Sequence, residues 1–252
     1  MVIGKVETRS PGDERSDHCG PALPHESFLQ AVASERATTH GPVGIGASFE
    51  KLTHHVRVVV LEAETCGYGA STRNGGFVDV SLTHGVLNGL SHWPDDFDTL
   101  ERLGRENLDG LLASIDRYGI ACHAHRADEV AFATAAWQMD DLSEEAETLA
   151  EHGLAHTLMD RDTAQARVHS PTFHGGLAYH DTIALLDPAR LVWGLVEAVE
   201  QLGGVVHDHS RVGGIDDHGG PLGVHTADGV VDADDLLPHH HPSQGTLARL
   251  TV

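Results

Sequence analysis

The stretch VRVVVLEAETCGYG, residues 56–69, decides the fold of this chain. Four valines and a leucine run almost without interruption up to Glu62. Such a run is typical of a strand covered on both faces, as in a parallel sheet. A glycine-rich turn, Gly67-Tyr68-Gly69-Ala70, follows it. The pattern predicts an α/β fold in which Glu62 lies at the tip of a buried strand.

The residues before this strand resemble a nucleotide-binding turn. A dinucleotide fold places glycines after its first strand and a carboxylate at the end of its second, where the carboxylate accepts hydrogen bonds from the adenosine ribose. Residues 39–44, THGPVG, fall in the register of G-x-G-x-x-G, with Gly41 and Gly44 at the later two glycines and Thr39 at the first. The distance from Gly44 to Glu62 is close to the roughly 20 residues expected. The alternative is an ordinary loop ahead of a buried strand.

Composition and charge exclude several classes of function. The formal charge is −22, which repels phosphate backbones, so we expect no nucleic-acid partner. No run of about 18 apolar residues and no apolar leader core is present, so we expect a cytoplasmic protein without a membrane span. The three cysteines, Cys19, Cys66 and Cys122, are far apart and indicate reduced thiols rather than a disulfide framework.

Periodicity predicts the main elements beyond the first strand. Apolar residues at helical spacing predict helices over residues 95–118 and 136–152. Asp187 and Pro188 are typical of a helix start, and this helix is expected to run to Leu202 before Gly203-Gly204. Residues 120–125 and 129–134 are interpreted as a hairpin around Ala127-Asp128. Further strands are expected at residues 175–181, 205–209, 212–215, 222–226 and 230–233.

The run that follows Glu62 carries a family resemblance. Residues 58–85, VVVLEAETCGYGASTRNGGFVDVSLTHG, strongly resemble the corresponding segment of the FAD-dependent oxidoreductases of the D-amino-acid oxidase superfamily. The likeness continues through LERLGRENLDGL, HSPTFHGGLAYHD and LLDPARLVWGLVEAVEQLGG, and spans about residues 41–233. It implies a Rossmann-like FAD-binding domain joined to a partial substrate domain that contains antiparallel strands.

The resemblance also implies a cofactor, a reaction and a set of binding residues. The cofactor is FAD, and the reaction is oxidation of a C–N bond in a small amine or amino acid, with hydride transfer to the flavin. Ser71 and Arg73 are expected to bind pyrophosphate oxygens. Val212 matches a family residue that contacts the adenine through its backbone. No catalytic residue is assigned. The expected cofactor-binding residues are Gly41, Gly44, Glu62, Ala63, Ser71, Arg73, Asn74, Gly75, Gly76 and Val212.

The domain assignment follows from the same match. Residues 38–85 and 184–236 are expected to form a discontinuous FAD-binding domain, with the partial substrate domain at 86–183. Residues 1–37 are expected to be poorly ordered and residues 237–252 to form an irregular tail. Pro238 and Pro242 are expected to interrupt a central strand there.

Two other functions remain open at this stage. Family members continue beyond the region matched here, so the chain is also interpreted as an inactive, truncated remnant that binds at most an adenine nucleotide. A metal-binding module built on His239-His240-His241 is the weaker alternative, because adjacent histidines do not point at one ion and no H-E-x-x-H is present. No metal is therefore expected.

Overall fold

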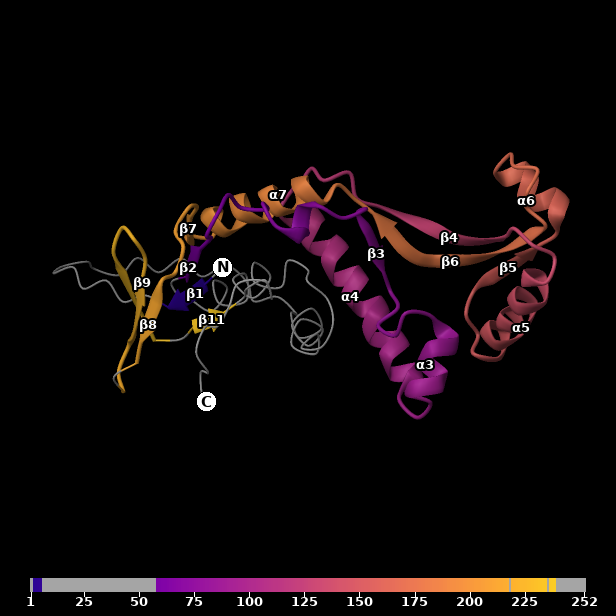
Figure 1. The fold of residues 1–252 in the computed structure, drawn as a ribbon, viewed down its shortest axis with the longest axis horizontal. Coiled ribbons are helices and arrows are strands. Elements are labelled where there is room, and N and C mark those ends of the chain that lie inside the picture. The colour runs from indigo at the N-terminus through magenta and orange to yellow at the C-terminus, as the bar shows by residue number, and fades with distance from the viewer. Residues whose placement is uncertain (1, 6–57, 218, 235, 239–252) are drawn as a thin grey trace. The chain divides into compact units, whose positions relative to one another are not determined.

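The computed structural model describes residues 2–5, 58–217, 219–234 and 236–238. They fall into two compact units (Figure 1). The first comprises the described residues within 1–74, 117–122 and 188–252, and the second comprises residues 75–116 and 123–187. The functional domain boundaries expected from the sequence stay a prediction.

A four-stranded sheet organises the first unit. Its order is β11 (Leu236–Pro238), β1 (Val2–Lys5), β2 (Val58–Leu61) and β7 (Val205–His207). Strand β2 runs parallel to β7 and antiparallel to β1. Val58, Val60 and Leu61 are almost fully buried, as the apolar run predicts. Residues 237 and 238 were expected in an irregular tail, and for these two residues that expectation was wrong, because they complete strand β11. Pro238 lies in the outermost strand of the described order, where a missing N–H is tolerated.

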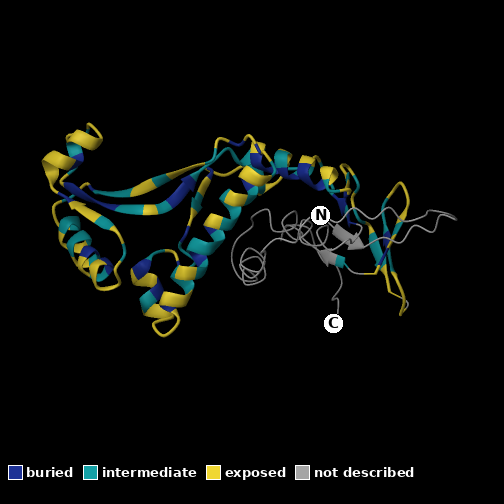
Figure 2. Cartoon of the chain, turned by 180° about the vertical axis from the view of Figure 1, so that it is seen from behind, coloured by how far each residue is buried: buried dark blue, intermediate teal, exposed yellow. Residues whose placement is uncertain are grey.

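Helix α7 (Pro188–Gln201) leads into β7 and begins at the predicted Asp187-Pro188 pair. Its buried residues are Leu191, Val192, Leu195, Ala198 and Val199, and Figure 2 shows the alternation of buried and exposed positions along it. A second, antiparallel sheet in this unit has the order β10 (Val230–Ala233), β9 (Leu222–His225) and β8 (Gly214–Asp216). Its buried Val224 and Ala233 pack in one apolar cluster with Leu61.

The second unit is built on the long strand β6 (Gly175–Leu185). Strands β3 (Phe77–Asp79), β4 (His125–Ala133) and β5 (His156–Met159) all pair with it antiparallel. Helices α3 (Val86–His92), α4 (Phe97–Arg117), α5 (Gln138–Glu151) and α6 (Arg161–Arg167) complete the described part of this unit. Phe97, Leu149 and Leu177 lie in one buried cluster that joins α4, α5 and β6.

The predicted hairpin at residues 120–134 is absent from the described structure, and that prediction was wrong. Residues 125–133 form the single strand β4, and its partner is β6, more than forty residues later in the chain. Ala127-Asp128 lies inside this strand at a register shift rather than in a turn. The α/β fold class, with antiparallel strands in the second unit, is confirmed.

Candidate functional site at the tip of β2

Glu62 lies at the carboxyl end of β2, as the sequence predicts. Its backbone N–H donates to the His207 carbonyl at 2.9 Å and so extends the parallel pairing with β7 by one residue. Its own carbonyl accepts from the Ser210 N–H at 2.7 Å, and its side-chain Oε1 accepts from the Glu64 N–H at 3.1 Å. Among the described residues, Glu64 is the one donor to this half-buried carboxylate.

The turn after β7 brings Val212 to the same region. Val212 packs against the cluster that contains Leu61, the residue before Glu62. Arg211 Nη2 lies 2.7 Å from Glu64 Oε1, so an ion pair also joins the two loops. The structure therefore places Glu62 and Val212 at neighbouring strand ends, although they are 150 positions apart in the sequence.

A negative environment surrounds this strand tip, and no sequence motif predicts it. The Cys66 N–H donates to Asp208 Oδ1 at 2.9 Å. The pKa of the Cys66 thiol is raised to about 12, mainly by burial. The hydrogen bond and charge of Asp208 raise it further, as do the charges of Glu62 and Glu200. Carboxylates accept hydrogen bonds and repel phosphates, so the site suits a ligand group rich in hydroxyl donors.

The glycine turn at residues 67–74 is held by its own side chains. Gly67 has a φ of +87°, and a Cβ there would lie 2.5 Å from Thr72 Cγ2. Asn74 Nδ2 donates to the Ala70 and Ser71 carbonyls at 3.3 and 3.1 Å. The Arg73 guanidinium lies over the Tyr68 ring, 4.5 Å from its centroid. Asn74 thus shapes the turn, and phosphate contacts by Ser71 and Arg73 stay a prediction.

The other predicted cofactor-binding residues have no polar side chain, so the structure shows only their backbone position or their burial. Gly75 and Gly76 belong to the second unit, where a Cβ on Gly75 would lie 2.9 Å from the Phe77 ring and the Gly76 carbonyl accepts from the Leu186 N–H at 3.0 Å. Ala63 is half-buried next to Glu62. Gly41 and Gly44 lie outside the described residues, as does the histidine run 239–241.

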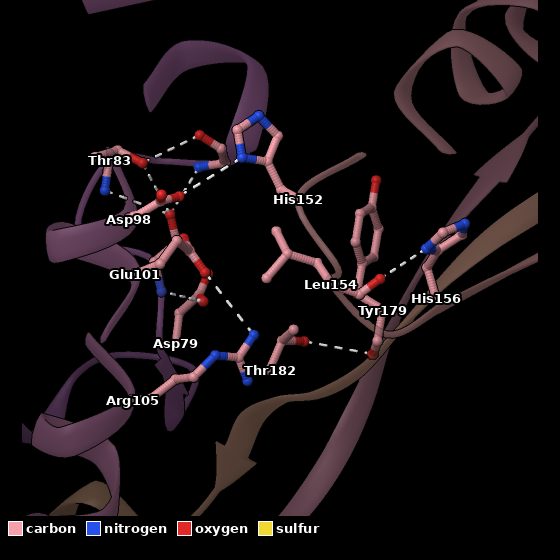
Figure 3. A network of polar contacts seen from close by, with 12 residues as sticks. Asp79, Thr83, Asp98, Glu101, Arg105, His152, Leu154, His156, Tyr179 and Thr182 are labelled. Carbon is pink, nitrogen blue, oxygen red and sulfur yellow. Dashed lines mark hydrogen bonds and ion pairs between the residues drawn. The ribbon is translucent and has the colours of Figure 1, made fainter. Parts of the chain in front are cut away.

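The second unit holds a pocket, lined by both charged and apolar residues, that no sequence motif predicts. Its volume is about 340 Å³, and Phe97, Glu101, Arg105 and His152 are among its lining residues. Figure 3 shows Glu101 beside both Asp79 and Arg105, and Arg105 Nη2 lies 3.8 Å from Glu101 Oε2. Burial raises the pKa of Glu101, the charge of Asp79 adds to this rise, and Arg105 and His152 oppose it.

Metal-ligand clusters and membrane-spanning helices are both absent from the part of the chain that the structure describes. Within it, no three His, Cys, Asp or Glu side chains gather as metal ligands would. None of its helices combines the length and the apolar character that crossing a bilayer requires.

Comparison of the sequence with known proteins identifies relatives of this chain. The family profile described as "FAD dependent oxidoreductase" (DAO) matches residues 41–237. A probable oxidoreductase of Haemophilus influenzae is 28% identical over 203 residues, and gamma-glutamylputrescine oxidoreductase of Escherichia coli is 30% identical over 201 residues. Each match covers 78% of this chain and 46% of the relative, so the chain spans about half the length of the curated relatives it matches.

Solved structures show the same fold at lower sequence identity. Glycine oxidase from Geobacillus kaustophilus superposes with a TM-score of 0.60 at 20% identity, over 75% of this chain and 50% of that one. NikD, an amino acid oxidase of nikkomycin biosynthesis, gives a TM-score of 0.59 at 18% identity, over 77% of this chain and 47% of that one. These matches and the family profile confirm the resemblance that the sequence indicated.

Proposed function

This chain belongs to the DAO family of FAD-dependent oxidoreductases, and on that premise we propose that it holds the adenosine end of FAD in an enzyme that oxidises the C–N bond of an amine or amino acid. The observation that carries this proposal is the place of Glu62. A half-buried carboxylate at the end of a strand, with a parallel strand beside it, is where a dinucleotide fold binds the ribose hydroxyls.

The described residues fit the adenosine end of the cofactor. Glu62 offers carboxylate oxygens to hydroxyl donors, and the neighbouring carboxylates of Asp208 and Glu200 keep the site acceptor-rich. The Val212 backbone would face the adenine, and Ala63 would lie beside the ribose. Gly41 and Gly44, with Ser71 and Arg73, would bind the pyrophosphate, and Asn74, Gly75 and Gly76 would pass along the ring system.

The substrate class follows from the relatives' names. One relative is named for gamma-glutamylputrescine, and structural neighbours are named for glycine and other amino acids. Bound FAD supplies the acceptor for the hydride that leaves the substrate carbon. We propose a small amine or amino acid as the substrate of the whole enzyme.

The test is cofactor binding by the full chain. Purified protein is expected to take up FAD and show the flavin absorbance bands, which bleach when a suitable amine is added without oxygen. Glu62→Gln removes a charge-assisted hydrogen bond worth about 1.5–3 kcal/mol, so FAD and ADP should each bind about 10- to 100-fold more weakly.

Glu197→Gln is the matched control, because this exposed glutamate on α7 changes the net charge equally without touching the strand tip. Equal affinities for the two variants would contradict the role of Glu62. Binding of ADP without uptake of FAD would favour the narrower function of an adenine-nucleotide-binding protein.

A further inference from the structure

Three side chains of the second unit form a continuous hydrogen-bonded chain. Thr157 Oγ1 lies 2.8 Å from Nε2 of His180, and Nδ1 of the same ring lies 3.0 Å from Asp128 Oδ2. The three residues come from β5, β6 and β4, respectively. A hydroxyl, an imidazole and a carboxylate thus follow one another in the order of a nucleophile activated by a general base.

The sheet register explains why these residues meet. Thr157 pairs with Ala178 across β5 and β6, and His180 is two residues further along β6, so both side chains lie on one face. Between the pairs Ala127–Ile183 and Glu129–Tyr179, β4 advances two residues and β6 advances four. This irregularity, in which Asp181 has a φ of +61°, brings Asp128 next to His180.

Donor and acceptor can be assigned in both hydrogen bonds between these three side chains. An ionised carboxylate only accepts hydrogen bonds, so the proton between Asp128 and His180 belongs to Nδ1. In the neutral ring Nε2 is then an acceptor, and the Thr157 hydroxyl donates to it. The hydrogen bond from His180 lowers the pKa of Asp128, helped by the Asp181 N–H and by Arg167. Asp128 therefore stays ionised at neutral pH and fixes the ring orientation.

The hydrogen-bonded side chains Thr157, His180 and Asp128 are accessible to solvent. The side chains of His180 and Asp128 are 35% and 33% exposed, and Thr157 is exposed on β5. Arg167 Nη2 lies 3.4 Å from Asp128 Oδ2 and places a positive charge on the same surface. A small solute can thus approach the Thr157 oxygen while its proton acceptor stays in place.

We propose that Thr157 is the nucleophile of a second site, which accepts an acyl group from small activated carboxylic esters. The Thr157 oxygen bonds to the carbonyl carbon as its proton passes to His180 Nε2. The ester C–O bond breaks, and His180 returns the proton to the departing alcohol. Water, activated by the same imidazole, then cleaves the acyl-threonine and releases the acid, so no oxidant or reductant is consumed.

The experiment uses the full chain and p-nitrophenyl acetate. Release of p-nitrophenolate gives the rate, and peptide mass spectrometry locates the acetyl group. We expect the acetyl group on Thr157, no such adduct in Thr157→Val, and a rate about 100-fold lower in His180→Gln. Thr172 is the internal control. It is another exposed threonine of this unit, its hydroxyl is hydrogen-bonded to Ser170, and its acetylation measures the background reactivity of hydroxyls.

His225→Gln is the matched control for imidazole reactivity. His225 Nε2 lies 2.7 Å from Asp216 Oδ2, and no hydroxyl among the described residues bonds to its other nitrogen. This variant should acetylate Thr157 at the wild-type rate.

Asp128 is a positioning residue, and its test is rescue by the conservative variant. Asp128→Asn replaces the charged acceptor that holds the Nδ1 proton of His180, so the rate should fall, and Asp128→Glu, which keeps the carboxylate, should recover part of it. The proposal is overturned if wild-type protein carries no more acetyl on Thr157 than on Thr172. A wild-type rate in His180→Gln overturns it as well.

Discussion

Substitution of Gly104 by alanine tests the close packing of α4 in the second unit. A Cβ on Gly104 would lie 1.7 Å from the Val80 carbonyl oxygen and 2.9 Å from its carbonyl carbon. The Val80 backbone cannot yield easily, because its N–H donates to the Thr182 carbonyl at 2.9 Å and its side chain is buried beside Leu108. The helix must therefore move.

The size of the effect follows from these distances. A carbon and a carbonyl oxygen approach to about 3.3 Å at closest, so α4 has to shift by about 1.6 Å. Overpacking of this kind costs about 3 kcal/mol, and the higher helix propensity of alanine returns about 1 kcal/mol. We expect Gly104→Ala to lower the free energy of unfolding by about 2 kcal/mol.

Urea unfolding followed by circular dichroism measures this change. Ala113→Gly is the matched control, because Ala113 is exposed on the same helix and the reverse exchange there should cost only the propensity difference of about 1 kcal/mol. Both exchanges should thus destabilise the protein. A Gly104→Ala variant more stable than wild type would refute the close contact.

Three further results are expected. Cys66 should react with iodoacetamide at pH 8 about 1000-fold more slowly than an ordinary thiol, because its pKa rises from 9.0 to about 12. Mass spectrometry measures the labelling of Cys66. Equal labelling of folded and urea-unfolded protein would contradict this prediction. The Asp160 carboxylate caps α6 by accepting from the Thr163 N–H at 2.9 Å, and hydrogen bonding by the Thr163 side chain and N–H lowers the pKa of this carboxyl. Asp160→Ala should therefore lower the thermal midpoint at pH 7, and the difference from wild type should vanish as the pH falls through that lowered pKa. Solubility should fall as the pH drops through about 6.5, because protonation of 21 histidines moves the formal charge from −22 to −1; unchanged turbidity from pH 8 to 5 would refute this.

Local signals predicted the long helices α4, α5 and α7 and the strand β2 well. The apolar spacing between residues 95 and 118 gives α4 to within about two residues, and Asp187-Pro188 marks the start of α7. The burial of β2 was likewise predicted, because a run of β-branched residues is apolar on both faces. In each case the information lies within one element.

Strand partners could not be predicted in the same way. Residues 120–134 alternate as a hairpin would, yet β4 pairs with β6, because alternation fixes which face is buried and not which strand lies alongside. The short elements β3, β5, α3 and α6 gave no periodic signal long enough to detect. Asp128 had the chemistry of a turn residue, but the structure uses its carboxylate to hold His180 and the Asp181 N–H.

The tip of β2 shows what the sequence and the structure each contribute to the site. The sequence placed Glu62 at a strand end, but Asp208, which is 142 positions from Cys66, joins that site only through the parallel pairing of β2 and β7. The resulting carboxylates oppose any phosphate at this point. We therefore expect an FAD bound here to present its ribose to Glu62 and to direct its pyrophosphate elsewhere. The cationic Arg73, only eleven residues beyond Glu62, and the glycines at 41 and 44 are then the groups whose substitution should weaken pyrophosphate binding without changing recognition of adenosine.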